Sequence, residues 1–441
     1  MLRIKPVILL LLLVKIQSGV ASDLLNIYQD AVAGAPQLEQ AREALAAVGE
    51  NYIQAKASLY LPEAAVSTNV YGNSQSVQLS QDSTGINGRS NFISAGYSLI
   101  LTQPLIHYDR VVGLEQSDSR VGQAHAEYAA TEIALILLLA ERYFDVLAAT
   151  ENLEFAQLQQ ASLARGLQET KQHEAAGYLA KTDVEEAQAG FDRAVTETLE
   201  AENVLKDAHA ALQELTGKRY TQLAHLGKEI PLIKPIPDKE TAWVEQARKQ
   251  NLTLQAIEYS VSAAKNEIQR QEAGHLPTLD AVGNHSFSSA GGRFGSADIQ
   301  DTSLGLNLTV PLYQGGRVNS KIREAEHRYR EVLAKQSAEQ RAVERTVSKA
   351  FHGVMLGISR IEALAQNLRS SQTAVAATES GFRVGRRTAL DVIVAEREQL
   401  RAQRDYARAR YDFLLNTLRL KHAVGTLSPS DLVQINRWLE S

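Results

Sequence analysis

An internal repeat is the strongest constraint on the fold, because it requires one structural plan to be used twice. The second half of the chain contains GHLPTLDAVGNHSF (274–287) and LGLNLTVPLYQGGR (304–317), which resemble LYLPEAAVSTNVYG (59–72) and YSLILTQPLIHYDR (97–110) in the first half. The two pairs are separated by 215 and 207 residues, so both copies keep nearly the same spacing. In each copy we expect a short helix, two strands, a very long helix, a tight interruption and a medium helix.

The N-terminus has the composition of a secretory signal peptide. Arg3 and Lys5 precede an apolar run that Lys15 ends, and Gly19-Val20-Ala21 suits signal cleavage. Loss of the three basic residues would change the net charge from −5 to −8, which argues against nucleic acid as a partner. The chain has no cysteine, and its ten histidines show no metal-binding spacing. We therefore expect an exported protein with no metal and no cofactor, and we find no residue set typical of an enzyme.

Period-two alternation predicts the strands. In the second copy Leu304, Leu306, Leu308 and Val310 alternate with Ser303, Gly305, Asn307 and Thr309, and Phe92 to Thr102 behave similarly in the first. The segments 63–79 and 278–290 alternate less well, and the polar stretches 80–90 and 291–300 are expected to be exposed hairpin connections. One such strand alone would favour a half-buried strand of a soluble sheet, but four in repeat positions of an exported chain favour a membrane β-barrel.

The number of strands predicts an oligomer. Four strands are too few to close a barrel, since about eight are the fewest that leave a filled interior. Open strand edges are not stable in lipid, so the edges should pair with other copies of the chain. Two copies would give a filled barrel of eight strands, and three would give twelve strands with room for a lumen.

The long helices should be rods that pack side by side. Proline is absent from 109–176 and from 317–384, and each of these 68-residue stretches would extend roughly 100 Å at ~1.5 Å per residue. A narrow apolar seam near a 3.5-residue spacing implies coiled-coil packing; it consists of Val347, Val354, Ile358, Ile361, Ala365, Leu368 and Val375. The medium helices are expected at about 24–59 and 182–215. The proline-rich stretch 227–240 is expected to be an extended linker or an edge strand.

Both long helices end in related phrases. HEAAGYLAKTDV (173–184) and GFRVGRRTALDV (381–392) place Gly177 and Gly385, like Asp183 and Asp391, 208 residues apart. The glycines are expected to end the helices with a positive φ. Thr182 to Glu185 fits a capping box, and Thr388 precedes Asp391 at the start of a helix. Helix capping alone could therefore account for both aspartates.

The segments VPLYQGG (310–316) and Gly385-x-x-Thr388-x-x-Asp391, in this order within the repeat, resemble TolC-type outer-membrane efflux proteins. The resemblance covers about residues 23–432. It implies an α+β fold and a homotrimer, in which a transmembrane barrel of twelve strands, four from each chain, continues into a long α-helical coiled-coil barrel. It also implies contact with outer-membrane lipid, a periplasmic adaptor (membrane fusion) protein and an inner-membrane pump of the RND or ABC transporter type. The cargo, drugs or secreted protein, stays open.

The resemblance also assigns roles to the tip and to the junction between strands and helices. It implies a gate latch in which Arg387 binds Asp183 and Thr182, with Phe382 where the family has a tyrosine. Asp391 would form an acidic ring in the pore, and Val394 replaces the second aspartate of that ring. We therefore expect a weaker latch and a single ring, with Arg386 left as a solvated charge. The junction residues are expected to be Pro62, Pro104, Pro277, Pro311, Gly315 and Gly316, the two glycines letting the strand bend into the helix.

The resulting prediction is an outer-membrane exit duct that spans into the periplasm and is opened at its tip by its inner-membrane partners. Its domains are expected to be a signal peptide (1–21), tunnel helices (22–61 and 241–275), paired barrel strands (62–105 and 276–313), periplasmic helices (106–217 and 314–425), an equatorial linker (218–240) and an equatorial C-terminal segment (426–441). One alternative is a non-conducting coiled-coil spacer anchored in the outer membrane, which needs no polar lumen. A second is a coiled-coil adhesin, which would carry its strands at one end of the chain.

Overall fold

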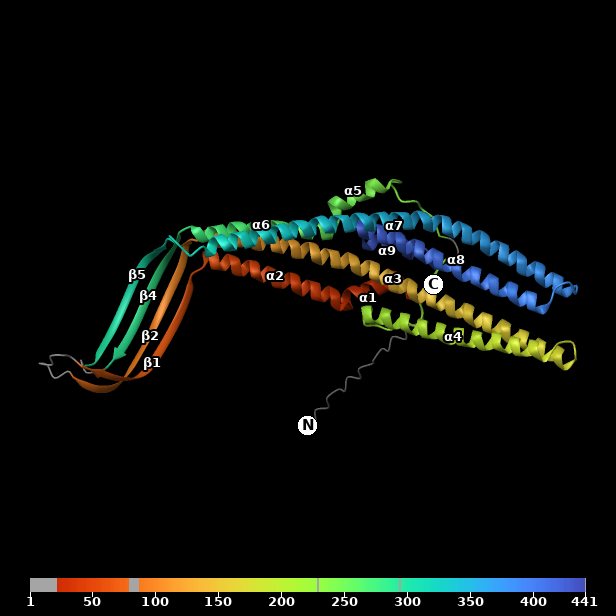
Figure 1. Cartoon of the computed structure of the whole chain (residues 1–441), viewed down its shortest axis with the longest axis horizontal. Coiled ribbons are helices and arrows are strands. Elements are labelled where there is room, and N and C mark those ends of the chain that lie inside the picture. Colours follow the sequence, from red (N-terminus) through yellow and green to blue (C-terminus); the bar gives the residue numbers. More distant parts are fainter. Residues whose placement is uncertain (1–21, 79–86, 228–229, 293–294, 441) are drawn as a thin grey trace, which may run out of the picture. The chain divides into compact units, whose positions relative to one another are not determined.

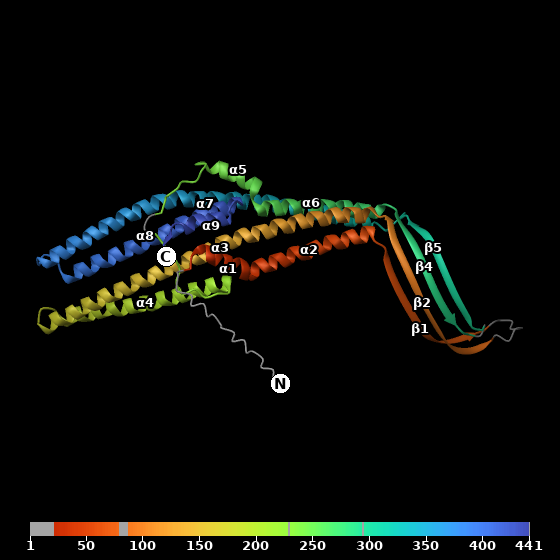
Figure 2. The same ribbon diagram turned by 180° about the vertical axis from the view of Figure 1, so that it is seen from behind.

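The structure is a computed structural model that describes residues 22–78, 87–227, 230–292 and 295–440, so the expected signal peptide lies outside the described residues. The chain divides into two compact units. The strand unit comprises residues 40–130 and 252–342, and the tip unit comprises the rest of the chain. Figures 1 and 2 show the path of the chain from opposite sides.

Four antiparallel strands form one sheet in the strand unit (Figure 1). They are β1 (Glu63–Val77), β2 (Gly88–Ile106), β4 (Thr278–Ala290) and β5 (Ala297–Thr309), in the order β1-β2-β4-β5. The four expected strands are therefore present. The hairpin connections are shorter than expected, because 88–90 and 297–300 pair as strand rather than loop. Residues 79–86 and 293–294 lie outside the described part of the chain.

The register places the apolar side chains of neighbouring strands on the same face of the sheet, since directly paired residues share a face. Val66 is opposite Leu99, and Gly283 is opposite both Leu101 and Leu304. The other face is polar and internally hydrogen bonded. There Ser98 Oγ donates to Asn284 Oδ1 at 3.0 Å. The alternation predicted from the sequence thus gives a sheet with one apolar and one polar face.

None of the described residues covers the apolar face. Leu304 is 88% exposed and Leu306 is 70% exposed. Burial of apolar surface stabilises proteins by about 25 cal/mol per Å², so a bare face of this kind needs lipid or protein against it. In addition, β1 and β5 each have a paired neighbour on one side only. The sheet is therefore incomplete both at its apolar face and at its two edges.

The two long helices are uninterrupted, as their lack of proline predicts. They are α3 (Tyr108–Ala175) and α7 (Arg317–Arg383), of 68 and 67 residues. The predicted seam of α7 is largely buried, with Val347 fully covered and Val354 and Ile361 nearly so. Among the described residues, no helix combines the length and the apolar character needed to cross a membrane.

Each of the two helices expected at 22–61 and 241–275 is divided in the structure. The first consists of α1 (Leu24–Gly34) and α2 (Pro36–Tyr60), because Pro36 has no N–H to donate and holds Ala35 in an extended conformation. The second consists of α5 (Glu240–Gln250) and α6 (Leu252–Glu272), followed by a 3₁₀ turn at Ala273–His275. The break is at Asn251, whose buried side-chain amide donates to the carbonyl of Ala423 at 2.8 Å.

The helices of the strand unit are tied together by a polar cluster around Glu267. Arg270 donates to both of its carboxylate oxygens, and Gln116 of α3 donates to Oε2 at 2.8 Å. Burial alone would raise the pKa of Glu267, but the hydrogen bonds from Arg270, Gln271 and Gln116 lower that pKa to about 2. The carboxylate therefore stays ionised and joins α3 to α6.

The core of the tip unit lies where α1 and α3 meet α4 (Lys181–Thr216), α8 (Ala389–Val424) and α9 (Pro429–Asn436). Three aromatic rings form its centre: Tyr143 lies edge-on to Phe144, and Phe144 contacts Tyr411. Tyr143 Oη donates to the carbonyl of Ala224, beside the short pair β3 (His225–Leu226) and β6 (Leu439–Glu440). The expected extended linker has no strand among 230–239.

Candidate functional site

The two long helices end in the same kind of turn at the tip. Gly177 and Gly385 have φ values of +80° and +72°, in the left-handed region that favours glycine. In the first turn Tyr178 N–H donates to the carbonyl of His173 and Gly177 N–H to that of Glu174. The second turn repeats both bonds at the corresponding positions. This double bond pattern is the Schellman motif, which satisfies carbonyls at a helix end and reverses the chain tightly.

The helices that leave the two turns begin differently. Thr388 caps α8, since its hydroxyl accepts from Asp391 N–H at 3.1 Å and its own N–H donates to Asp391 Oδ2 at 2.9 Å. The prediction of a capping box from Thr182 to Glu185 was wrong. Here α4 begins at Lys181 and Ala180 is its N-cap, so Asp183 accepts the N–H of Ala180 but no side-chain hydroxyl returns the bond.

The cap of α8 also determines the charge state of Asp391. The backbone N–H of Thr388 and then its hydroxyl hydrogen bond to the carboxylate, and the nearby Arg387 adds attraction, so the pKa of Asp391 is lowered. A hydrogen bond to the charged form of a carboxyl group favours that form. Asp391 is thus held as an exposed anion at the first turn of α8.

One hollow brings together residues of both turns. It has a volume of about 660 Å³ and lies among α3, α4, the end of α7 and the start of α8. Of the residues singled out from the sequence, Asp183, Phe382, Thr388 and Val394 line it. Phe382 is 46% exposed, and its ring has no hydroxyl that could donate to Asp183. The hollow has apolar walls, with Asp183 and Glu186 on its α4 side.

Arg387 does not pair with Asp183 within the described chain. Its side chain lies back over Gly381, where an added Cβ would meet Arg387 Cγ at 2.8 Å. Among the described residues its side chain makes no hydrogen bond or ion pair to Asp183 or Thr182, and its charge contributes to lowering the pKa of Asp391. A latch formed by Arg387 and Asp183 would therefore have to join two copies of the chain.

The junction prolines and glycines lie where strands and helices meet. Pro62 and Pro277 immediately precede β1 and β4, while Pro311 follows β5. Pro104 lies inside β2 at a register shift, beyond the point where β1 stops pairing, so its missing N–H interrupts no bond to β1. Gly315 and Gly316 have φ values of +60° and +76° directly before α7.

A groove along α3, between α4 and α8, was not found from the sequence. Three hollows follow one another along these helices. The first and second share the lining residues Asn152, Val204 and Arg404, and the second and third share Gly190 and Arg397. The α8 wall is basic on balance, because its four arginines, Arg397, Arg401, Arg404 and Arg408, outnumber two acidic side chains of the same helix. The α4 wall is acidic on balance, because Glu186, Glu197, Glu200 and Asp207 outnumber Arg193. The helical spacing of the four arginines was the signal that could have revealed it.

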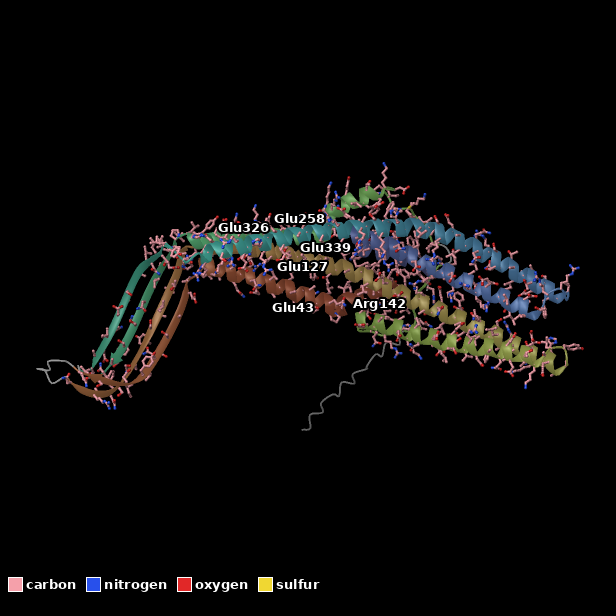
Figure 3. All side chains as sticks on the ribbon, viewed as in Figure 1. Glu43, Glu127, Arg142, Glu258, Glu326 and Glu339 are labelled. Carbon is pink, nitrogen blue, oxygen red and sulfur yellow. The ribbon has the colours of Figure 1, made fainter. Side chains whose placement is uncertain are left out.

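Carboxylates are spread along the helices of the strand unit and do not converge. Figure 3 labels Glu43, Glu127, Glu258, Glu326 and Glu339 at separate positions on α2, α3, α6 and α7. Within the described part of the chain, no group of three or more histidine, aspartate or glutamate side chains is placed to hold a metal ion.

Comparisons with known proteins agree with this geometry. The family model for outer membrane efflux proteins matches residues 27–218 and 243–426. Outer membrane protein TolC of Vibrio cholerae is 35% identical over 425 residues, which are 95% of this chain and 94% of that protein. TolC of Escherichia coli is 32% identical over 95% of this chain and 85% of its own length.

More distant matches extend the comparison to secretion and to solved structures. The alkaline protease secretion protein AprF of Pseudomonas aeruginosa is 27% identical over 76% of this chain and 70% of its own length. The crystal structure of the Campylobacter jejuni CmeC outer membrane channel has a TM-score of 0.78 at 15% identity, covering 95% of this chain and 90% of that one, and so shares the fold. On the family match and on its likeness to the two TolC proteins, the chain belongs to the outer membrane efflux protein family.

Proposed function

We propose that three copies of this chain form the outer-membrane exit duct of an efflux or type I secretion machine, closed at the tip until its partners open it. Membership of the family makes the chain an outer-membrane efflux or secretion channel. Channels of the TolC family are homotrimers that work with an adaptor and an inner-membrane pump. The relatives are channel proteins, in agreement with a passive duct that has no catalytic site.

The observation that carries the proposal is the two-faced sheet with two unpaired edges. Edge β1 of one copy would pair with edge β5 of the next, because open edges are not stable in lipid. Three copies give twelve strands, with Leu304 and Leu306 toward lipid and Ser98 and Asn284 toward the lumen. A polar lumen is what separates a duct from a non-conducting anchored spacer, which would have no use for it. The repeated element order would follow from duplication of an ancestral half.

The tip would close through contacts between copies. Arg387 of one copy would reach Asp183 and Thr182 of the next, since no ion pair joins Arg387 to Asp183 in the described part of one chain and Asp183 lines an open hollow. Phe382 would contribute apolar contact in place of a hydroxyl. The Schellman turns at Gly177 and Gly385 would keep both hairpins compact enough to meet at the axis.

Asp391 would form the acidic ring of the closed pore. Three carboxylates near one axis raise one another's pKa, which would tend to neutralise the ring. The cap hydrogen bonds from Thr388 act in the opposite direction and favour the ionised form. An ionised ring would select cations in the closed channel. Val394, one turn further along α8, would leave it a single ring.

The adaptor would dock in the groove along α3. Because the groove has a basic wall on α8 and an acidic wall on α4, it is complementary to a helix with acidic residues along one edge and basic residues along the other. Arg401 lies on the basic wall and has no ion pair among the described residues. Its reversal, Arg401→Glu, is expected to reduce recovery of the adaptor with the channel, while the trimer itself is retained.

Recordings from planar bilayers test the duct and its latch together. Wild-type trimers should conduct weakly, and Arg387→Ser should raise the single-channel conductance, with a larger rise when Asp183→Ala is added. Arg386→Ser is the matched control, because it removes the neighbouring charge outside the proposed latch. Unchanged conductance in both latch variants, with wild-type channels present, would show the latch assignment to be wrong.

A further inference from the structure

We infer that Glu396 of α8 and Ser162 of α3 form a clamp within each chain that holds the α7–α8 turn against α3. The inference rests on the proposed function, because it concerns how that channel stays closed. Ser162 Oγ donates to Glu396 Oε2 at 2.5 Å, and the guanidinium of Arg165 lies 3.9 Å from the same oxygen. The Ser162 side chain is buried, and Glu396 is 29% exposed. The bond is thus shielded from water on the α3 side.

The clamp forms where the backbone of α3 lies close to α8. Gly166 follows Ser162 by one helical turn, and a Cβ at Gly166 would press directly on Ile393 Cδ1. Ile393 in turn precedes Glu396 by three residues, so both contacts lie on facing surfaces of two antiparallel helices. A side chain at position 166 would separate α3 from α8. The glycine therefore brings the carboxylate within reach of the buried hydroxyl.

The clamp is the described polar contact between α3 and α8 that lies nearest the tip. The other contacts join α8 to α3 further from the turn, through Tyr411 to Glu151, Arg408 to Asp145 and Arg419 to Glu141. Closer to the turn, neither Arg386 nor Arg387 makes a side-chain hydrogen bond or ion pair to α3 or α4 among the described residues, and Phe382 has no polar group. Any movement of the α7–α8 turn away from α3 must first break the clamp.

Bilayer recordings with a double-mutant cycle test the clamp. A hydrogen bond to a charged group contributes about 1.4 kcal/mol or more, which corresponds to about a tenfold change in an equilibrium. We expect Ser162→Ala and Glu396→Ala each to raise the fraction of time at high conductance about tenfold. The double variant should add little to either, since both changes remove the same bond. Glu396→Gln keeps an oxygen that can accept from Ser162 and should be closer to wild type.

Two controls make the result decisive. Glu398→Ala removes a neighbouring exposed carboxylate of α8 that makes no hydrogen bond or ion pair within the described residues, and it should leave gating unchanged. Because the chain has no native cysteine, Ser162→Cys with Glu396→Cys can be joined by a short bismaleimide. The link should suppress the high-conductance level even when Arg387→Ser is present.

The outcomes separate the clamp from the channel. If Arg387→Ser raises conductance while Ser162→Ala, Glu396→Ala and the bismaleimide link change nothing, the clamp is overturned and the duct stands. If wild-type trimers insert and never conduct, the proposed function fails and the clamp fails with it.

Discussion

A methyl group added at Gly425 should destabilise the tip unit far more than the same change at Gly217. Both glycines are C-caps with positive φ, +86° at the end of α8 and +69° at the end of α4, and they lie 208 residues apart. No atom of the described part of the chain lies within 4 Å of an added Cβ at Gly217. At Gly425 the same atom would press on the backbone oxygen of Gln250 and lie 3.1 Å from Asn251 Cα.

The magnitudes follow from this difference. The left-handed conformation costs an alanine roughly 1–2 kcal/mol at either site. At Gly425 overpacking against backbone adds about 1–3 kcal/mol. Displacement of Asn251 would also strain its buried hydrogen bond to Ala423, which contributes about 1 kcal/mol. We therefore expect Gly425→Ala to lower the free energy of unfolding by ~3–6 kcal/mol and Gly217→Ala by ~1–2 kcal/mol.

Denaturant unfolding of the purified protein measures the difference. The chain has two tryptophans, Trp243 and Trp438, and both lie in the tip unit, so their fluorescence reports the unit that contains both glycines. The midpoint of Gly425→Ala should fall well below that of Gly217→Ala at an unchanged slope. Equal midpoints for the two variants would refute the steric reasoning, because only the left-handed penalty would then remain.

Five further substitutions, in three tests, probe other parts of the structure. Burial raises the pKa of Glu151, although a hydrogen bond from a tyrosine opposes the shift. Ionisation of Glu151 therefore weakens the fold as the pH rises above 4.5. Glu151→Gln should raise the denaturant midpoint of unfolding at pH 7 and remove this pH dependence. Ala180→Thr should supply the missing N-cap hydroxyl of α4 and stabilise by about 1 kcal/mol, whereas Thr388→Ala should cost about as much, both read by the same unfolding assay. Leu306→Arg on the apolar face should cost ~2–4 kcal/mol and reduce the trimer recovered from membranes, whereas Asn307→Arg on the polar face should be tolerated.

The elements with strong periodicity could be predicted from the sequence. Alternation predicts the strands and the apolar face that carries Leu304 and Leu306, and the observed register aligns the apolar residues of neighbouring strands. The lack of proline found both long helices nearly to the residue. The glycines 208 residues apart pointed to the repeated turn, because a reversal with positive φ needs glycine whatever surrounds it.

The features that depend on distant contacts could not be predicted in this way. Pro36 is a local signal for the break between α1 and α2. The break at Asn251 has no such signal, because it is coupled to the approach of Gly425 and the carbonyl of Ala423 in α8. The start of α4 is set by how the chain leaves the turn at Gly177. The N-cap is Ala180, so the Thr-x-x-Glu pattern that begins two residues after it, at Thr182, does not mark the start of the helix.

Pairs across the fold were also beyond the sequence. The contact between Ser162 and Glu396 joins residues 234 positions apart, and neither side chain belongs to a recognisable motif. The groove along α3 depends on α4 and α8 being placed on either side of that helix. Such sites are visible only once the packing of the tip unit is known.

Current through single trimers in a planar bilayer tests the central claim most directly. If three copies form a duct with a polar lumen and a closed tip, purified wild-type protein should insert as trimers and give small, cation-selective steps. Insertion of trimers that never carry current, in wild type and in Arg387→Ser alike, would contradict the duct and favour a non-conducting anchored spacer.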